Sequence, residues 1–542
     1  MTGMKVCQMN FKNSFVESLP GLSLNQEVSR QAQQTPGVAY SFVTPEKVSH
    51  PSLISWSESA AQLLDLDVVK LDPVEFAQVF SGNHVCAGMK PYAARYGGHQ
   101  FGHWAGQLGD GRAITLAEVV NSVGQSWEIQ LKGAGRTPYS RGADGRAVLR
   151  SSLREYVCSE AMYHLGVPTT RALSCVSTGD SVVRDLFYDG NPAPEPGAIT
   201  TRLAPSFIRF GHFQICAFHS ELELMTQLVH YVIDQHFPQF KTLQGEYKYL
   251  QWYSHVVETT ASLIVDWLRV GFVHGVMNTD NLSIHGLTID YGPYGWLDVY
   301  DPDWTPNTTD AQHRRYRFAA QPAIALWNLA QLGEALGPLL GGFQAVEDIL
   351  TDYQQSFRDQ LLSMMGKKLG FQAKMDQRGI ELIEGLDRVL RMTEIDTTIF
   401  YRQLAELHGL YSEQGEGAGK KDPKTFLEPL RAAFYAEAPS EPALKALVQW
   451  LQDYLSWSQT DGTSVEEKVQ MMNQTNPFFI PRNYILQQCI DGVAKGDTAV
   501  LNKVMMAIKT PYEDSALTRE FFKKRPEWAR HKAGCSALSC SS

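Results

Sequence analysis

The sequence predicts an α+β protein with a β-rich N-terminal part and a larger, helical C-terminal part. Between residues 92 and 150 the chain is rich in glycine and contains short segments of strand-forming residues. Beyond residue 218, apolar residues recur at helical spacing over most of the remaining chain. At 542 residues the chain is too long for one simple core, so we expect two or three packed units.

Two strands and one helix can be placed in the N-terminal part. Residues 113–119 and 127–131 carry β-formers, and the second segment alternates apolar with polar side chains. Residues 150–165 place apolar side chains at helical spacing, and Gly166 and Pro168 follow as stop signals. The breaker-rich segment 189–197 is predicted to be a loop or the boundary between two lobes.

The C-terminal part is predicted to begin with a helix capped by Ser220 and Glu223, which have the spacing of a capping box. The stretch 414–421 lacks the spacing of a P-loop and is interpreted as a solvated loop. Further helices are expected at 250–271, 321–336, 343–365, 376–392 and 442–456.

The chain divides into four expected segments, two of which are lobes. Each boundary follows a change in pattern, and the first segment is expected to be mostly irregular because prolines interrupt it. The segments are an N-terminal leader packed on the following domain (1–90), a nucleotide-binding N-lobe (91–198), a helical C-lobe with the catalytic and metal loop (199–485), and a C-terminal tail (486–542).

Composition excludes several classes of function. The chain has 48 Lys and Arg against 58 Asp and Glu, a net charge of −10, so no general basic surface favours nucleic acid. The most apolar helical stretch, 250–271, is interrupted by charged side chains and is not expected to cross a membrane. No targeting segment is recognisable at the start, and the cytosol is the expected location.

The eight cysteines are scattered without a CxxC pair, which favours neither a zinc module nor a disulfide framework. Most are expected to be reduced and structural. Cys535 and Cys540 lie in a Ser-rich terminus where packing is not expected to hide them. They are either a reversible short-range disulfide or two free thiols of no consequence.

A glycine-rich segment, 106–112, stands just before the first predicted strand. Glycines let backbone amides approach a phosphate closely, and Arg112 adds positive charge. A plain glycine-rich hairpin explains the same pattern equally well.

Lys132 ends the second predicted strand, and Glu155 lies on the helix that follows. Protein kinases use a strand lysine held by a helix glutamate to bind nucleotide phosphates. The alternative is a surface lysine and an unrelated solvated glutamate. The turn between strand and helix, where the helix N-terminus favours phosphate, contains Arg141, Asp144, Gly145 and Arg146.

The most informative motif runs from His274 to Asn281 and is followed by Asp290. Kinases have a histidine, a catalytic aspartate two residues later, a metal-binding asparagine five residues after that, and a metal-binding Asp-Phe-Gly aspartate. Here Val276 occupies the catalytic position and cannot accept a proton, so Asp280 is the nearest replacement. A tight loop whose side chains cap the backbone is the structural alternative.

The side chains of Asn281 and Asp290 offer the hard oxygen ligands that Mg²⁺ prefers, with Mn²⁺ as the other candidate ion. Arg202 and Arg209 have guanidinium groups suited to a phosphate. From their spacing alone, however, two arginines in surface ion pairs are the better interpretation.

Taken together, the motifs resemble the selenoprotein O (SelO/YdiU) family. The similarity spans most of residues 90–340 and rests on the segments 96–102, 106–112, 130–135, 150–162, 201–212 and 274–291. The resemblance implies a two-lobed, protein-kinase-like fold that binds ATP in an inverted orientation. It also implies a pseudokinase-like site that transfers AMP to Ser, Thr or Tyr hydroxyls of proteins.

The resemblance also implies roles for individual residues. Asn281 and Asp290 are the implied metal ligands, Asp280 activates the acceptor, and Lys132 pairs with Glu155. Nucleotide contacts are implied for Gly109, Gly111, Arg112, Lys132, Asp144, Gly145, Arg202, Arg209 and Asp290. Two other functions fit the same motifs: an atypical kinase that uses Asp280 as its base, and a catalytically inactive ATP-binding scaffold.

The chain departs from the family pattern at its C-terminus. The family is named for a selenocysteine near the C-terminus, where this chain has Cys540. Some relatives carry a cysteine after the metal loop that can be locked to the tail. The corresponding stretch here, 303–307, contains Pro306 and no thiol, so that lock is not expected.

Overall fold

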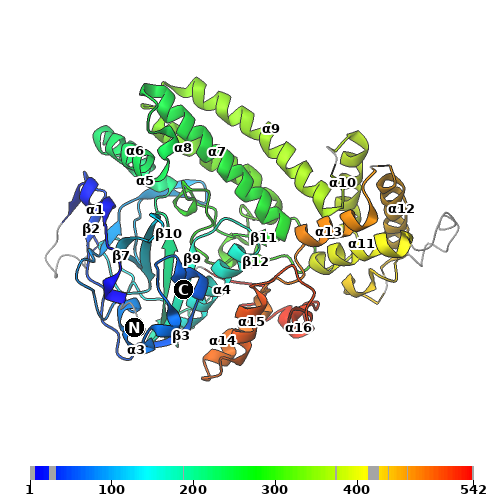
Figure 1. The fold of residues 1–542 in the computed structure, drawn as a ribbon, viewed down its shortest axis with the longest axis horizontal. Coiled ribbons are helices and arrows are strands. Elements are labelled where there is room, and N and C mark those ends of the chain that lie inside the picture. The colour runs from blue at the N-terminus through cyan, green and yellow to red at the C-terminus, as the bar shows by residue number, and fades with distance from the viewer. Residues whose placement is uncertain are drawn as a thin grey trace.

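A computed structural model shows a β-rich N-terminal part and a helical C-terminal part, which confirms the predicted α+β class (Figure 1). The structure describes residues 6–22, 32–186, 188–372, 375–412, 427–437, 439–460 and 462–539. The predicted loop at 414–421 lies outside these residues. Within the described residues, no helix is both long and apolar enough to cross a membrane.

An eight-stranded sheet forms the N-terminal part, in the order β1-β2-β4-β7-β8-β10-β9-β3. Its pairs are antiparallel except for β1 and β2. The strands are β1 (Gly21–Leu22), β2 (Tyr40–Phe42), β3 (Ser52–Trp56), β4 (Tyr92–Ala94), β7 (Ala113–Val120), β8 (Ser126–Lys132), β9 (Arg171–Arg184) and β10 (Ala193–Ala204). The hairpin β5 (Gly97–Gln100) and β6 (His103–Gln107) forms a separate small sheet.

The alternation along β8 assigns its side chains to two faces of the sheet. Ile129 and Leu131 belong to a hydrophobic core to which α3 (Pro73–Phe80) and α2 (Glu58–Gln62) also contribute side chains. Gln130 and Lys132 point to the other face, and the register places them opposite Arg202 and Thr200 of β10. The polar side chains of the two strands are therefore neighbours.

The helix α4 (Leu149–His164) covers this second face, as the pattern at 150–165 predicts. Leu153, Val157 and Ala161 pack with Ala172 and Ala198 of the sheet in one core. This packing is why Glu155 of the same helix is held next to the end of β8.

Long helices dominate the remainder of the chain (Figure 1). The predicted helices at 250–271, 321–336, 343–365, 376–392 and 442–456 are confirmed within a few residues at their ends. The helices of this part are α5 (Phe210–Phe218), α6 (Leu222–His236), α7 (Gly245–Val270), α8 (Gln321–Leu336), α9 (Phe343–Lys368), α10 (Gln377–Leu390), α11 (Thr397–Ser412), α12 (Glu441–Ser458), α13 (Val465–Thr475), α14 (Asn483–Val493), α15 (Ala499–Ala507) and α16 (Ala516–Phe521). A short pair of strands, β11 (Phe272–Val273) and β12 (Gly295–Trp296), lies among them. The short helix α1 (Ser14–Ser18) belongs to the N-terminal part.

Three local predictions are wrong. The segment before residue 91 is not irregular, because it supplies β1, β2 and β3 to the main sheet. The loop predicted at 189–197 is partly strand, because β10 begins at Ala193. The two prolines of β10 lie in the part of the strand that pairs with β9 but not with β8. They therefore remove no hydrogen bond between β10 and β8. The capping box is not formed, because Ser220 adopts a left-handed backbone with φ of 56° and Glu221 stands at the N-cap.

The cysteines also differ from expectation. Cys7 and Cys86 form a disulfide, although neither spacing nor context in the sequence indicated one. Cys535 is 3% exposed, and burial raises its pKa to about 11, so it is not the accessible thiol that was predicted. Cys540 lies outside the described residues, and the proposed pairing of these two cysteines stays a prediction.

The C-terminal tail is fixed by hydrogen bonds to the stretch that lacks a thiol. The backbone amide of Leu538 donates to the oxygen of Pro306 at 2.9 Å, and that of Thr308 donates to Leu538 at 2.8 Å. Asn307 in turn donates through Nδ2 to the oxygen of Gly275 at 3.0 Å. The tail therefore reaches the segment that carries the candidate site.

Candidate active site

A cavity of about 790 Å³ separates the sheet from the segment after β11. It is lined by the glycine-rich segment, the 136–146 turn, the ends of β8 and β9, and residues 276–293. More basic than acidic side chains line it: Arg112, Lys132, Arg136, Arg141, Arg146, Arg184 and Arg202 against Asp110, Asp144, Asp185 and Asp290. Such a surface favours an anionic ligand.

Lys132 and Glu155 form the ion pair that the motif predicts. The Nζ atom of Lys132 lies 2.8 Å from the Glu155 carboxylate and 3.7 Å from that of Asp290. Burial lowers the pKa of Lys132, and the two carboxylates oppose this shift. Lys132 lines the cavity, whereas Glu155 stands behind it and is 2% exposed.

Arg202 and Arg209 are buried in ion pairs with the predicted metal ligand. Arg202 contacts Glu155 at 2.9 Å and Asp290 at 2.5 Å, and Arg209 contacts the other oxygen of Asp290. Both arginines are 1% exposed, so they are not the surface pair that spacing alone favoured. Arg202 lines the cavity, and Arg209 lies deeper, where its Nη1 donates to the Asp280 backbone oxygen at 3.0 Å.

These contacts keep Asp290 ionised. Burial alone would raise the pKa of its carboxyl group, but Arg209, Arg202 and Lys132 together hold that pKa well below its usual range. The residue adopts a left-handed backbone, φ 56°, which turns its side chain toward this cluster. A carboxylate that stays charged in a cavity is a suitable ligand for a divalent cation.

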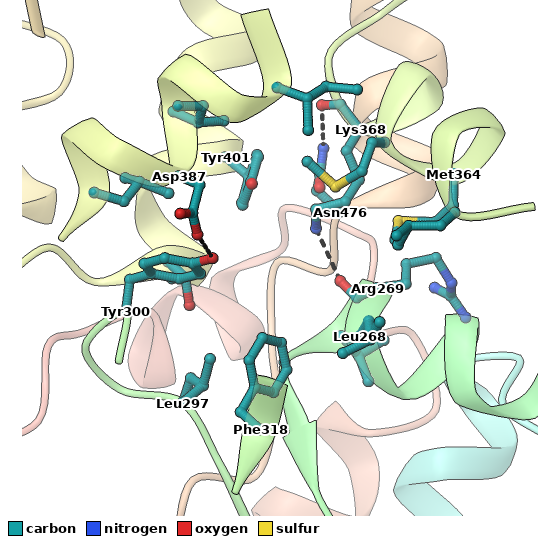
Figure 2. A pocket seen from close by; sticks show the side chains of 18 of the residues that line it. Leu268, Arg269, Leu297, Tyr300, Phe318, Met364, Lys368, Asp387, Tyr401 and Asn476 are labelled. Carbon is teal, nitrogen blue, oxygen red and sulfur yellow. Dashed lines mark hydrogen bonds between the residues drawn. The ribbon is translucent and has the colours of Figure 1, made fainter. Parts of the chain in front are cut away.

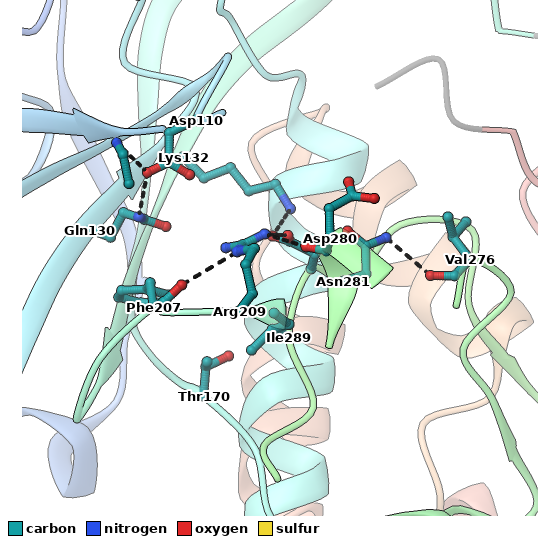
Figure 3. Close-up of polar contacts among 12 residues, drawn as sticks. Asp110, Gln130, Lys132, Thr170, Phe207, Arg209, Val276, Asp280, Asn281 and Ile289 are labelled. Atoms are coloured by element: carbon teal, nitrogen blue, oxygen red, sulfur yellow. Dashed lines mark hydrogen bonds and ion pairs between the residues drawn. The ribbon is translucent and has the colours of Figure 1, made fainter. Parts of the chain in front are cut away.

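Asn281 and Asp290 both line the cavity and present oxygen donors to it. Asn281 donates through Nδ2 to the oxygen of Val276 at 3.0 Å, which leaves Oδ1 as the ligand atom (Figure 3). Each carboxylate oxygen of Asp290 retains a lone pair beside its arginine. The donor set therefore fits Mg²⁺, or Mn²⁺, in chemical type.

Asp280 lies beside this pair but does not line the cavity. Figure 3 shows Lys132 reaching from the strand toward Asp280 and Asn281, with Arg209 alongside. Burial raises the pKa of Asp280 to about 6, and its Oδ1 has no hydrogen-bond partner among the described residues. Its Oδ2 accepts from Nε2 of Gln100 at 3.4 Å. A carboxylate with one free oxygen among the described residues and a pKa near neutrality has the properties of a general base.

The two remaining parts of the kinase-like motif are structural. His274 is 1% exposed, and its Nε2 lies 2.9 Å from the oxygen of Ile289, which ties the start of the motif to the chain just before Asp290. Val276 lines the cavity with an apolar side chain. At this position, therefore, no group can accept a proton.

The glycine-rich segment borders the cavity, with Gly109, Gly111 and Arg112 among its lining residues. Gly109 has φ of 80°, and a Cβ atom there would lie 2.4 Å from the Tyr139 ring. A Cβ on Gly111 would lie 2.8 Å from the Tyr139 oxygen. These glycines are thus required by close packing on the 136–146 turn, independently of any phosphate.

Asp144 and Gly145 line the cavity from the opposite turn. Asp144 is paired with Arg184 of β9 at 2.7 Å, so its carboxylate is held by a strand distant in sequence. Gly145 has φ of 68°, and a Cβ there would lie 2.0 Å from the Gly135 oxygen, which makes glycine obligatory.

Sequence reasoning did not assign a site role to several lining residues. Asp110 stands within the glycine-rich motif and could have been chosen from it. Arg184 and Tyr188 carry no sequence signal, because they reach the cavity only through the long β9 strand and the turn that follows it.

Comparison with known proteins agrees with this geometry. A model of the family described as "Protein adenylyltransferase SelO" matches residues 23–509. The chain is 48% identical over 532 residues to "Protein nucleotidyltransferase YdiU" of Azoarcus sp. (strain BH72), covering 98% of this chain and 99% of that protein. Proteins of the same name from Aromatoleum aromaticum and Xanthomonas euvesicatoria are 49% and 48% identical, each covering 98% of this chain and 99% of the relative. The chain therefore belongs to the protein adenylyltransferase SelO family.

Proposed function

We propose that this protein is a protein adenylyltransferase, which transfers AMP from ATP to Ser, Thr or Tyr hydroxyls of other proteins. The observation that carries the proposal is a basic cavity that holds kinase-like Lys132, Asn281 and Asp290 but has Val276 where a kinase has its base. Family membership supports the same activity. The N-lobe at 91–198 and the C-lobe at 199–485 would enclose the nucleotide in a kinase-like fold.

The nucleotide contacts follow from the lining residues. Lys132, Arg112 and Arg202 supply positive charge to the phosphates, and Gly109, Gly111 and Gly145 allow close approach. Asp144, held by Arg184, is an acceptor for donors on the nucleotide. We propose the inverted orientation of ATP, because transfer of AMP requires an exposed α-phosphorus, whereas phosphoryl transfer requires an exposed γ-phosphorus.

Asn281 and Asp290 would hold Mg²⁺ or Mn²⁺, which would neutralise part of the phosphate charge when bound. Arg209 keeps Asp290 ionised and in place from behind the cavity. Glu155 likewise holds Lys132 and Arg202 in place from behind the cavity, since its carboxylate forms an ion pair with each.

The chemical step is a displacement at the α-phosphorus. The acceptor oxygen forms a bond to this phosphorus, the bond between the α-phosphorus and the bridging oxygen breaks, and pyrophosphate leaves with that electron pair. The hydroxyl proton passes to the carboxylate of Asp280, the only acidic side chain in the 274–281 segment.

Labelled ATP tests the proposal. The protein is incubated with an acceptor protein mixture and with ATP labelled at either the α- or the γ-phosphate. Label from the α-position alone on protein is the expected result. Transfer of γ-label would identify a phosphotransferase, and ATP binding without any transfer would identify an inactive scaffold; either outcome overturns the proposal.

A further inference from the structure

A second cavity, of about 330 Å³, lies within the helical part, away from the candidate active site. The ends of α7 and α9 form it together with α10, α11 and the chain after β12 (Figure 2). Its volume is at the lower end of the ~300–1,000 Å³ range of small-molecule pockets. Most of its lining is apolar, including Leu268, Leu297, Phe318, Leu362, Met364 and Leu386.

Three charged residues line this cavity, and two of them are paired elsewhere. Arg269 forms an ion pair with Asp266 at 2.8 Å, and Asp387 forms one with Arg391 at 2.8 Å. Asp387 also accepts a hydrogen bond from the Tyr300 hydroxyl at 2.5 Å. Lys368 has no ion pair with any described residue, although it is 5% exposed.

Lys368 is held in place by uncharged partners only among the described residues. Its Nζ atom donates to the backbone oxygen of Arg269 at 2.8 Å and lies 4.0 Å from the centre of the Tyr401 ring. Burial, with a smaller contribution from Arg269, lowers the pKa of Lys368 to about 7. A buried lysine without a counter-ion is costly, and a bound anion would remove that cost.

Asn476, the C-cap residue of α13, brings an unused acceptor next to the end of α9. Asn476 donates through Nδ2 to the Lys368 backbone oxygen at 3.0 Å, and its buried Oδ1 has no partner among the described residues. A water molecule that accompanies a polar head group would satisfy this atom.

We propose that this cavity binds a medium-chain carboxylate, such as a fatty acid, with its head group on Lys368. The apolar lining suits an unbranched chain, and among the described lining residues the Lys368 ammonium group is the only positive charge without an acidic partner. A small volume excludes bulky amphiphiles. A cationic or neutral head group of the same chain would leave the charge of Lys368 unpaired.

The position of the cavity links such a ligand to the candidate active site. Gly271 and Leu297 both line it, and the amide of Leu297 donates to the Gly271 oxygen at 2.9 Å. Two residues after Gly271, β11 ends and the 274–281 segment begins. An occupied cavity would therefore stabilise the base of the segment that carries Asn281.

Calorimetric titration of the full-length protein with decanoate tests the proposal. Saturable binding at one site per chain is expected, with decanol and decyltrimethylammonium binding at least ~10-fold more weakly, which is the factor that one hydrogen bond to a charged group contributes. Lys368→Met should weaken decanoate by a similar factor. Lys367→Met, on the exposed face of the same helix, is the matched control and should bind as the unchanged protein does.

Leu362→Phe provides a second variant that keeps the lysine. It narrows the cavity and should weaken decanoate more than octanoate. The proposal is overturned if decanoate does not saturate, if decanol binds equally well, or if both Lys368→Met and Leu362→Phe leave decanoate binding unchanged.

Discussion

At the scale of single residues, the candidate site is a buried charge cluster. Three cations, Lys132, Arg202 and Arg209, share two carboxylates, those of Glu155 and Asp290. Each cation has a carboxylate partner, but the five groups together carry one excess positive charge. A bound phosphate would complete the balance, which gives the arginines a role in binding even though Arg209 does not reach the cavity surface.

Asp290→Asn should reduce AMP transfer by at least ~100-fold, because it removes the charged oxygen donor and leaves the cations with Glu155 alone. The measurement is the initial rate with α-labelled ATP, with circular dichroism to verify the fold. Asp359→Asn, at an exposed position of α9, is the control and should be fully active. Near-normal turnover of Asp290→Asn would refute the assignment of Asp290 as a metal ligand.

The transfer rate should fall as the pH drops through about 6, the raised pKa of Asp280. The base must be deprotonated to accept the hydroxyl proton, so activity is present above this pKa and lost below it. ATP binding should persist over the same range, because the pKa of Asp290 lies well below it. A rate profile that keeps its shape in Asp280→Asn would assign the titration to another group.

At the scale of elements, the glycine-rich segment shows why residue type alone did not explain its role. Gly106 and Gly109 both adopt a left-handed backbone, with φ of 74° and 80°. Nothing lies within 4 Å of a Cβ built on Gly106, whereas a Cβ on Gly109 would overlap the Tyr139 ring. The two glycines therefore satisfy different constraints.

Gly109→Ala should destabilise the protein by ~2–4 kcal/mol, because backbone strain adds to overpacking against Tyr139. Gly106→Ala should cost only the backbone strain, ~1 kcal/mol. Urea unfolding of both variants, followed by fluorescence, measures the difference. Equal losses in the two variants would show that the contact with Tyr139 is not restrictive.

At the scale of the whole molecule, the two ends of the described chain are each joined to a segment distant in sequence. The disulfide from Cys7 to Cys86 spans 79 residues and ties the first described residues to the segment after α3. At the other end, Leu538 bonds to Pro306 and Thr308, next to the Asn307 contact with Gly275. In this chain, therefore, hydrogen bonds hold the tail at the stretch 306–308.

Reduction should lower the midpoint of thermal unfolding, because a bridge across a long loop stabilises a protein by ~2–4 kcal/mol. The Cys7→Ser and Cys86→Ser double variant should show the lower midpoint at once and no response to dithiothreitol. Thiol titration of the unfolded, unreduced protein is the direct check. Two of the eight cysteines are bridged, so fewer than eight thiols should react. Reaction of all eight thiols would contradict the disulfide.

Local pattern was sufficient for the α+β class, for the strands β7 and β8, and for most of the long helices, because periodicity reports directly which side chains are buried. It also identified Lys132, Glu155, Asn281 and Asp290 as candidates, since their order along the chain is distinctive. Strand β2 has only three residues, too few for a periodic signal, and its place in the sheet depends on pairing with β4.

How the candidate residues meet depends on contacts between segments that are distant in sequence. The order of residues along the chain is enough to establish the chemical types in the candidate site, but the burial and ion pairing of these side chains are established only by folding. Arg202 and Arg209 look like surface residues by spacing, yet folding places them against Asp290. The same holds for the buried thiol of Cys535 and the unpaired Lys368, because a side chain's charge state and exposure are set by neighbours that pattern along one segment does not contain.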